Sequence, residues 1–136
     1  MQNLGCLSAD VVRGAGKACE GAWGIIPWDT VLNNPESQAF KKALLDAFGP
    51  GVEAQESDVT AMGYMAMKSL LLAMQKAHSD TDVKAIDRAL FKLDWVTPLG
   101  WKWQLEQNGS FLYRELFITH VKHGKLGVAA AMPKYR

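Results

Sequence analysis

The longest helical pattern in the sequence, from Ser57 or Asp58 to about Ala77, constrains the fold most strongly. Its apolar residues cover a wide face of the helix and not a narrow stripe. They are Val59, Met62, Met67, Leu70, Leu71 and Met74. A helix with such a face depends on other segments to cover it, so we expect this helix to be deeply buried.

Three further helices are predicted in the first two thirds of the chain. The first spans 8–18. Asn34-Pro35 supplies the cap and first-turn proline that begin the second, and Gly49-Pro50 ends it. The third follows Thr81, which can cap it. Their apolar stripes consist of Val11, Val12 and Ala15, then Phe40, Leu44 and Phe48, then Val83, Ile86, Leu90 and Leu93.

Extended segments are predicted at two places. The apolar run from Ala22 to Ile26, between glycine and proline, is typical of a strand buried on both faces of a parallel sheet. After Leu93 the sequence becomes rich in aromatic and β-branched residues. Strands are expected there at 95–97, 100–105, 112–122 and 125–130, with turns at Asn108-Gly109 and His123-Gly124. The fold class is therefore α/β, with helices early and strands late.

Length and charge exclude several classes of protein. The 136 residues suffice for one compact region. Fifteen basic and fourteen acidic residues leave a net charge of +1, which gives no field to attract nucleic acid or an anionic membrane. No segment reaches the ~20 apolar residues of a membrane span. The first residues contain no recognisable export signal.

No catalytic motif is complete. Gly14-Ala15-Gly16-Lys17 resembles part of a phosphate-binding loop, but Val11 and Ala18 occupy positions where glycine and Ser or Thr are needed. Cys19 stands where a dinucleotide-binding motif needs glycine or alanine. The Gly-x-Ser-x-Gly and His-Glu-x-x-His motifs do not occur. We therefore expect neither enzymatic activity nor a cofactor.

The histidines and cysteines do not predict a metal site. His120 and His123 are three apart on a predicted strand and its turn, so their side chains point to opposite faces. His78 lies at a helix end, where an imidazole can meet terminal carbonyls. All three are interpreted as surface residues. Cys6 and Cys19 are interpreted as small packed side chains, with a 6–19 disulfide as the alternative.

The five tryptophans are the most informative residues for binding. Trp28 follows the apolar strand at its carboxyl end, where open α/β sheets bind ligands, so it is a candidate to stack on a ligand. Packing over the sheet edge is an equally good interpretation. Trp95, Trp101 and Trp103 are assigned to core packing or to a contact between lobes.

The order of motifs resembles a known family. The matching residues begin with Glu20-Gly21 before an apolar strand and Pro27-Trp28-Asp29 after it. Further matches are Pro35, Phe40, Phe48-Gly49, Gly63-Tyr64-x-Ala66, Ser79 to Asp82, Ala89-Leu90, Thr97-Pro98-Leu99-Gly100, Asn108-Gly109 and Val121 to Lys125. This set resembles the substrate-binding proteins of branched-chain amino acid and amide ABC transporters, of the Leu/Ile/Val-binding type. Met65 and His123 depart from the family pattern, which has Asp, and Asp or Asn, at these places.

The resemblance implies a partial type I periplasmic-binding fold. Such proteins have two α/β lobes joined by three crossover strands, and ligand binds as the lobes close. Residues 1–29 would end one lobe and cross over, 30–96 would form the helical part of the other lobe, and 97–136 would form a crossover and the last strands. The single region is thus incomplete and matches the carboxyl-terminal part of the family.

The resemblance also implies a function. The full-length protein would be periplasmic and would deliver an amino acid, or a related small carboxylate or amide, to an ABC permease. Among the residues of this chain, Trp28 and Tyr64 are the candidate ligand contacts. The chain alone would lack most of the binding cleft, and its uncovered apolar faces would favour self-association. The alternative is a free-standing α+β module that binds another protein.

Overall fold

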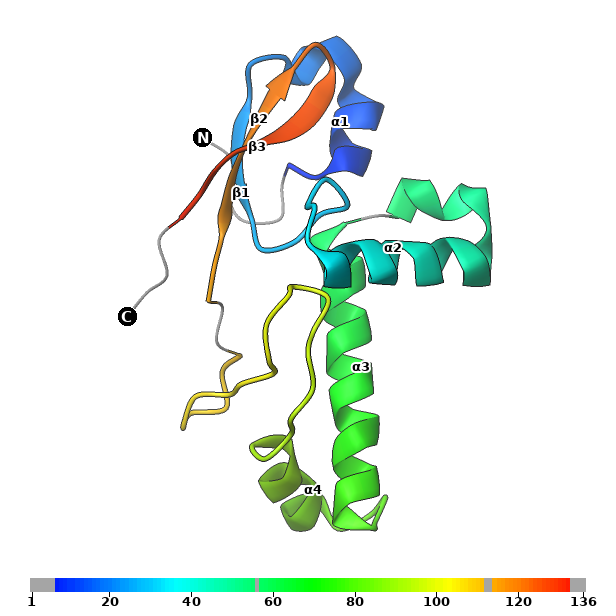
Figure 1. Ribbon diagram of the computed structural model, residues 1–136, viewed down its shortest axis with the longest axis vertical. Coiled ribbons are helices and arrows are strands. Elements are labelled where there is room, and N and C mark those ends of the chain that lie inside the picture. Colours follow the sequence, from blue (N-terminus) through cyan, green and yellow to red (C-terminus); the bar gives the residue numbers. More distant parts are fainter. Residues whose placement is uncertain (1–6, 56, 112–113, 133–136) are drawn as a thin grey trace.

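The computed structural model describes residues 7–55, 57–111 and 114–132 (Figure 1). A small sheet with α1 beside it forms one end of the molecule, and α3 extends away from it with α4 at its far end. The helices are α1 (Ala9–Ala15), α2 (Pro35–Phe48), α3 (Asp58–Ala77) and α4 (Val83–Leu90), with short 3-10 turns η1 (Gly16–Cys19) and η2 (Pro50–Gln55). The strands are β1 (Trp23–Ile26), β2 (Phe117–Lys122) and β3 (Lys125–Ala131). Helices early and strands late were predicted, and this order is confirmed.

The sheet is antiparallel throughout, with the order β1-β2-β3. The expectation that β1 lies in a parallel sheet is therefore wrong for the described chain. β1 pairs with a strand almost one hundred residues later, so Trp23 lies opposite His120. The predicted turn at His123-Gly124 is confirmed, and both residues have positive φ, 53° and 70°, as a two-residue hairpin turn requires.

The two faces of the sheet differ. On one face α1 covers a cluster formed by Leu7, Val12, Val121 and Leu126. Gly24 allows this close packing, because a Cβ there would lie 2.8 Å from the Cβ of Leu7. On the other face Trp23 stacks on His120 with ring centroids 4.1 Å apart and remains 46% exposed. The expectation that β1 is buried on both faces is thus also wrong.

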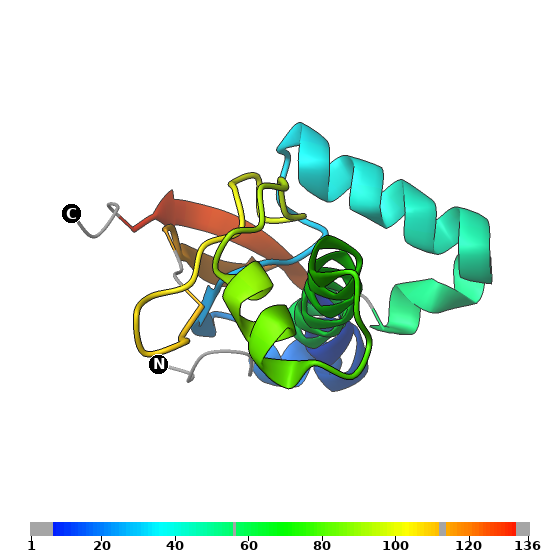
Figure 2. The same ribbon diagram turned by 90° about the horizontal axis from the view of Figure 1, so that it is seen from below.

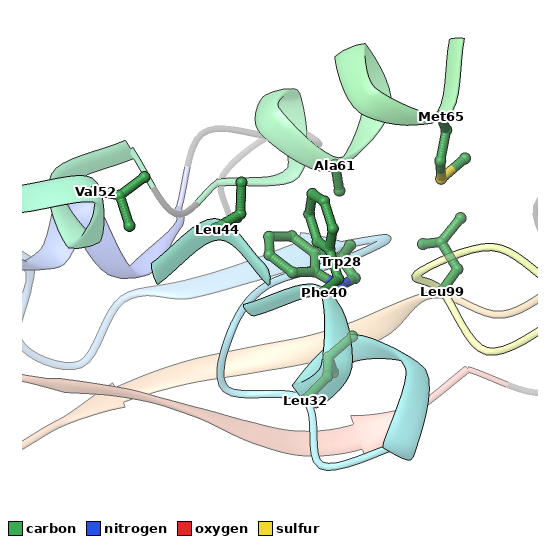
Figure 3. Packing of buried hydrophobic residues seen from close by; sticks show 8 residues of the cluster. All are labelled: Trp28, Leu32, Phe40, Leu44, Val52, Ala61, Met65 and Leu99. Carbon is green, nitrogen blue, oxygen red and sulfur yellow. The ribbon is translucent and has the colours of Figure 1, made fainter. Parts of the chain in front are cut away.

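The main apolar core lies where α2 crosses the start of α3 (Figure 3). This Trp28 cluster consists of Trp28, Leu32, Phe40, Leu44, Val52, Ala61, Met65 and Leu99. Asn34 caps α2 as predicted, since its side chain accepts a hydrogen bond from Ser37 N–H at 2.7 Å. Phe48, expected on the same buried stripe, is 71% exposed because the last turn of α2 extends beyond the cluster. Figure 2 shows this end of α2 projecting from the molecule.

The burial of α3 differs from the prediction. Its buried positions are Ala61, Met65, Ser69 and Ala73, together with Asp58 at its start. The face predicted to be deeply buried is largely open: Val59, Met67, Leu70 and Leu71 are 70, 58, 38 and 53% exposed. The described segments therefore give these four side chains little cover. We call these four residues the outer face of α3.

The ends of the last two helices agree with the sequence prediction only in part. His78 caps α3 in the left-handed conformation, with φ of 51°. Beyond it, Asp82 rather than Thr81 caps α4, because the Asp82 carboxylate accepts a hydrogen bond from Ala85 N–H at 3.0 Å. Ile86 packs on Ala73 of α3, whereas Val83 from the predicted stripe is 75% exposed.

The segment between α4 and β2 contains little regular strand. The strands expected at 95–97 and 100–105 are reduced to two isolated bridges, Val96 with Lys102 and Leu105 with Phe111. Leu112 and Tyr113 of the expected 112–122 strand lie outside the described residues, and regular pairing begins at Phe117. The indole N–H groups of two tryptophans secure this segment to helices instead: Trp95 donates to Ser69 Oγ and Trp103 to the Leu90 carbonyl. Strand propensity alone therefore did not produce regular strands in this segment.

The two cysteines can be placed only in part. Cys19 carries a free thiol, which donates to the Gly16 carbonyl at 3.1 Å. Cys6 lies outside the described residues.

Candidate functional site

Both candidate ligand residues belong to one row of aromatic side chains. Trp28 meets Phe40 edge to face at 5.4 Å between ring centroids, and Phe40 meets Tyr64 at 4.7 Å. The loop after β1, α2 and α3 each supply one ring. The structure therefore brings Trp28 and Tyr64 together, although they do not touch each other directly.

Trp28 forms the buried end of this row. Its side chain has no exposed surface, and its indole N–H donates to Ser37 Oγ at 3.1 Å. Ser37 Oγ in turn donates to the Pro98 carbonyl at 2.7 Å. These two bonds join the loop after β1, the first turn of α2 and the 97–100 turn. In the described chain Trp28 therefore offers no free ring face and fixes the position of its neighbours.

Tyr64 forms the open end and lines a cavity of about 250 Å³ between α2, α3 and the 96–98 segment. We call this cavity the Tyr64 pocket. Its lining includes Glu36, Phe40, Tyr64, Lys68, Thr97 and Pro98. Tyr64 is 40% exposed, so its ring is accessible to a ligand. The cavity is close to the smallest volumes, about 300 Å³, that are usual for small-molecule sites.

Lys68 is held in place at this pocket. Its Nζ donates to the Tyr64 hydroxyl at 3.0 Å and lies 4.7 Å from the centre of the Trp95 ring. Tyr64 and Lys68 are four residues apart, so they share one face of α3. The pocket thus combines an aromatic wall, one fixed cation at Lys68 and one carboxylate at Glu36. Such a lining can bind a small molecule that has an apolar or aromatic body and a carboxylate.

Sequence reasoning missed Phe40 and Lys68 as members of the site. Phe40 was assigned to the helix stripe, which is correct, but its contact with Tyr64 depends on how α2 crosses α3. For Lys68 the sequence contains a usable signal, because the four-residue spacing from Tyr64 places both on one side of a helix.

A buried carboxylate lies beside the site, at the end of the same loop as Trp28. Asp29 has no exposed surface and accepts hydrogen bonds from Ala9 N–H at 2.9 Å and Val31 N–H at 3.2 Å. Burial raises the pKa of Asp29, and these bonds only partly offset that effect. Burial likewise raises the pKa of Asp58 at the start of α3, with a smaller contribution from Asp10. Both carboxylates have structural roles at helix starts.

The histidines are dispersed: His78 ends α3, His120 stacks on Trp23, and His123 is in the β2–β3 turn. Among the residues with described positions, no group of His, Cys, Asp and Glu could hold a metal ion. Within that same part of the chain, none of the helices combines the length and apolar character needed to cross a membrane.

Comparison with known proteins identifies the family. The profile of the periplasmic binding protein family matches residues 2–125, so the chain belongs to that family. Its members are binding proteins and not enzymes, in agreement with the expectation from the sequence. No match was found among curated protein sequences.

Solved structures share the fold. A leucine-binding protein from Thermotoga maritima is 22% identical with a TM-score of 0.71, over 92% of this chain and 34% of that one. A solute-binding protein from R. palustris in complex with benzoate is 20% identical with a TM-score of 0.77, over 92% and 34%. A branched-chain amino acid ABC transporter protein from Thermus thermophilus with bound valine is 15% identical with a TM-score of 0.67, over 94% and 37%.

The aligned regions include nearly all of this chain but only part of each solved structure. The chain spans about one third of the length of these structures. It therefore has the α/β fold of part of a periplasmic binding protein, as the resemblance implied.

Proposed function

We propose that this chain is part of the substrate-binding component of an ABC transporter for amino acids or related small carboxylates and amides. The Tyr64 pocket carries the proposal, because it pairs aromatic rings with one fixed cation. Similar folds occur with bound valine and with benzoate, which share a carboxylate attached to an apolar body. Lys68 would attract the carboxylate, and Phe40 and Tyr64 would contact the apolar body.

In this proposal Trp28 acts through Phe40. Its buried ring holds Phe40 against Tyr64, and its bond to Ser37 holds the 97–98 wall of the pocket. Trp28 is thus a positioning residue and Tyr64 a contact residue. The division into lobe segments at 1–29, 30–96 and 97–136 belongs to the same proposal. Delivery to an ABC permease and a periplasmic location for the whole protein are also parts of this proposal.

The outer face of α3 supports the idea that the binding protein has further parts. Relatives of this fold are about three times longer than the region they share with this chain. We propose that such a remainder covers Val59, Met67, Leu70 and Leu71 in a full-length binding protein. Without it the same face would drive self-association or, in the alternative function of an interaction module, contact with another protein.

The binding proposal is tested by titrating the chain with leucine, valine, benzoate and 4-hydroxybenzoate in a calorimeter. The chain supplies only part of a cleft, so we expect weak binding of at least one of these carboxylates. Tyr64→Ala should weaken it at least tenfold, and Lys68→Met should weaken it similarly by removing the cation. Phe91→Ala is the matched control, since Phe91 is 44% exposed beyond the end of α4. Binding that survives both pocket substitutions would disprove the role of this pocket.

A further inference from the structure

A second cavity lies on the other side of α2, toward α1 and the β2–β3 turn. Its volume is about 330 Å³. Arg13 of α1, Lys41 of α2 and Lys125 at the start of β3 all line it. We call it the Arg13 pocket. Three cations from segments far apart in the sequence thus converge on one concavity.

The described lining of this pocket contains three basic side chains. No carboxylate is among its described lining residues, although the whole chain has nearly equal numbers of acids and bases. Elsewhere lysines do have acidic partners, as in Lys42 with Asp46 and Lys102 with Asp94. Within the described residues, Arg13 and Lys125 form no ion pair. Like charges gathered in a concave site create a field that attracts an anion.

Hydrogen bonds hold the walls of the pocket in place. Asp29 joins Ala9 to Val31, two lining residues, by accepting both of their N–H groups. Glu20 accepts the Gly124 N–H at 2.9 Å and so holds the turn that carries Lys125. Asp29 is fully buried and does not line the cavity. Both acids therefore support the walls, and neither is among the lining residues of the cavity.

The lining also indicates the shape of the anion. Phosphate sites generally use several free backbone N–H groups. Here the N–H groups of Ala9 and Gly124 are already bonded to carboxylates. The cations come from three separate elements, and the buried side chains of Val12 and Leu126 provide an apolar wall. Separated cations with an apolar surface fit two carboxylates joined by a short carbon chain.

We propose that the Arg13 pocket binds a small organic dicarboxylate, with Arg13 and Lys125 each contacting a carboxylate. The site differs from the Tyr64 pocket in every lining residue. The inference is independent of the transport proposal, because it depends only on the charges and supports of this cavity.

The test is calorimetric titration of the 136-residue chain with glutarate at low ionic strength, with neutral glutaramide as the matched probe. We expect glutarate to bind and glutaramide not to bind. R13Q and K125Q should each weaken glutarate at least tenfold, whereas R13K and K125R should retain most of the binding. Lys84→Gln on the exposed side of α4 is the control that should leave glutarate binding unchanged.

Several results would overturn the proposal. These are no glutarate binding, equal binding of glutaramide, or glutarate binding that R13Q and K125Q leave intact. Tighter binding of inorganic phosphate than of glutarate would refute the dicarboxylate assignment. Arg13 and Lys125 are both exposed, and circular dichroism of each variant establishes that it is folded. If Tyr64→Ala abolished glutarate binding, the ligand would belong to the Tyr64 pocket instead.

Discussion

Both sides of α3 carry a methionine near the middle of the helix, yet only one side is covered. Met65 on the inner side is 2% exposed in the Trp28 cluster, and Met67, two residues further on, is 58% exposed. Hydrophobic periodicity cannot distinguish these residues, because it records which positions are apolar and not which neighbours exist. The difference shows that a helix sequence can be adapted to more neighbours than one segment of chain supplies.

The largest expected effect concerns the centre of the covered side. Trp28→Ala removes the largest fully buried side chain and leaves Ser37 without one of its partners. We expect it to lower the free energy of unfolding by about 3–5 kcal/mol, measured by urea denaturation. Trp23→Ala is the control, because Trp23 is half-exposed on the open face of the sheet. A smaller loss for Trp28 than for Trp23 would contradict the assignment of the core.

Met65 and Met67 allow the covered and open sides of α3 to be compared most directly. Met65→Ala should cost about 2–5 kcal/mol of unfolding free energy, because it leaves a cavity in the Trp28 cluster. Met67→Ala should cost less than about 0.5 kcal/mol, because its side chain lies mostly in water. Both are measured by urea denaturation at low protein concentration. Equal losses would mean that the outer face of α3 is covered in solution.

A smaller effect is expected from the hydrogen bonds at the edge of the cluster. Ser37→Ala removes the acceptor of the Trp28 indole N–H and the donor to the Pro98 carbonyl. Leaving such buried groups unpaired should cost about 1–3 kcal/mol, measured by thermal and urea unfolding. Ser37→Thr keeps a hydroxyl and serves as the control. A neutral Ser37→Ala would show that water satisfies both groups.

If the outer face of α3 packs against a second copy of the chain, the chain should self-associate in solution. A double substitution, Met67→Lys with Leu71→Lys, places charges on this face. Sedimentation velocity should show that the parent chain associates at tens of micromolar and that the variant is monomeric, while its unfolding free energy changes by less than about 0.5 kcal/mol. A monomeric parent chain would argue against association through α3.

The smallest effect concerns pH at the start of α3. The folded-state pKa of Asp58 is raised above 3.8 by burial, so the native state retains a proton that the unfolded state has lost. The stability contribution of Asp58 therefore decreases as pH rises from 3.8 through the raised value. Asp58→Asn should reduce this decrease in a series of urea titrations across that range. An unchanged pH profile would show that Asp58 does not contribute to it.

Much of the local structure was predictable because it depends on neighbouring residues. The Asn34 cap, the His78 end of α3 and the His123-Gly124 turn follow from side-chain and backbone preferences within a few positions. The candidate site was only half predictable. The family resemblance made Tyr64 a candidate contact, and its spacing from Lys68 is a local signal within α3, but its contact with Phe40 depends on the crossing of α2 and α3.

The sequence by itself determined the early helices and late strands, the family, and local features such as the Asn34 cap and the His123-Gly124 turn, since each depends on local chemistry or on motif order. The tertiary structure alone decided that β1 pairs antiparallel with β2, that Trp28 is enclosed, and that one side of α3 is open. The first two features depend on contacts between residues far apart in the chain. The third arises because the described segments give that side of α3 little cover. It is these long-range contacts that also gather Arg13, Lys41 and Lys125 around one cavity.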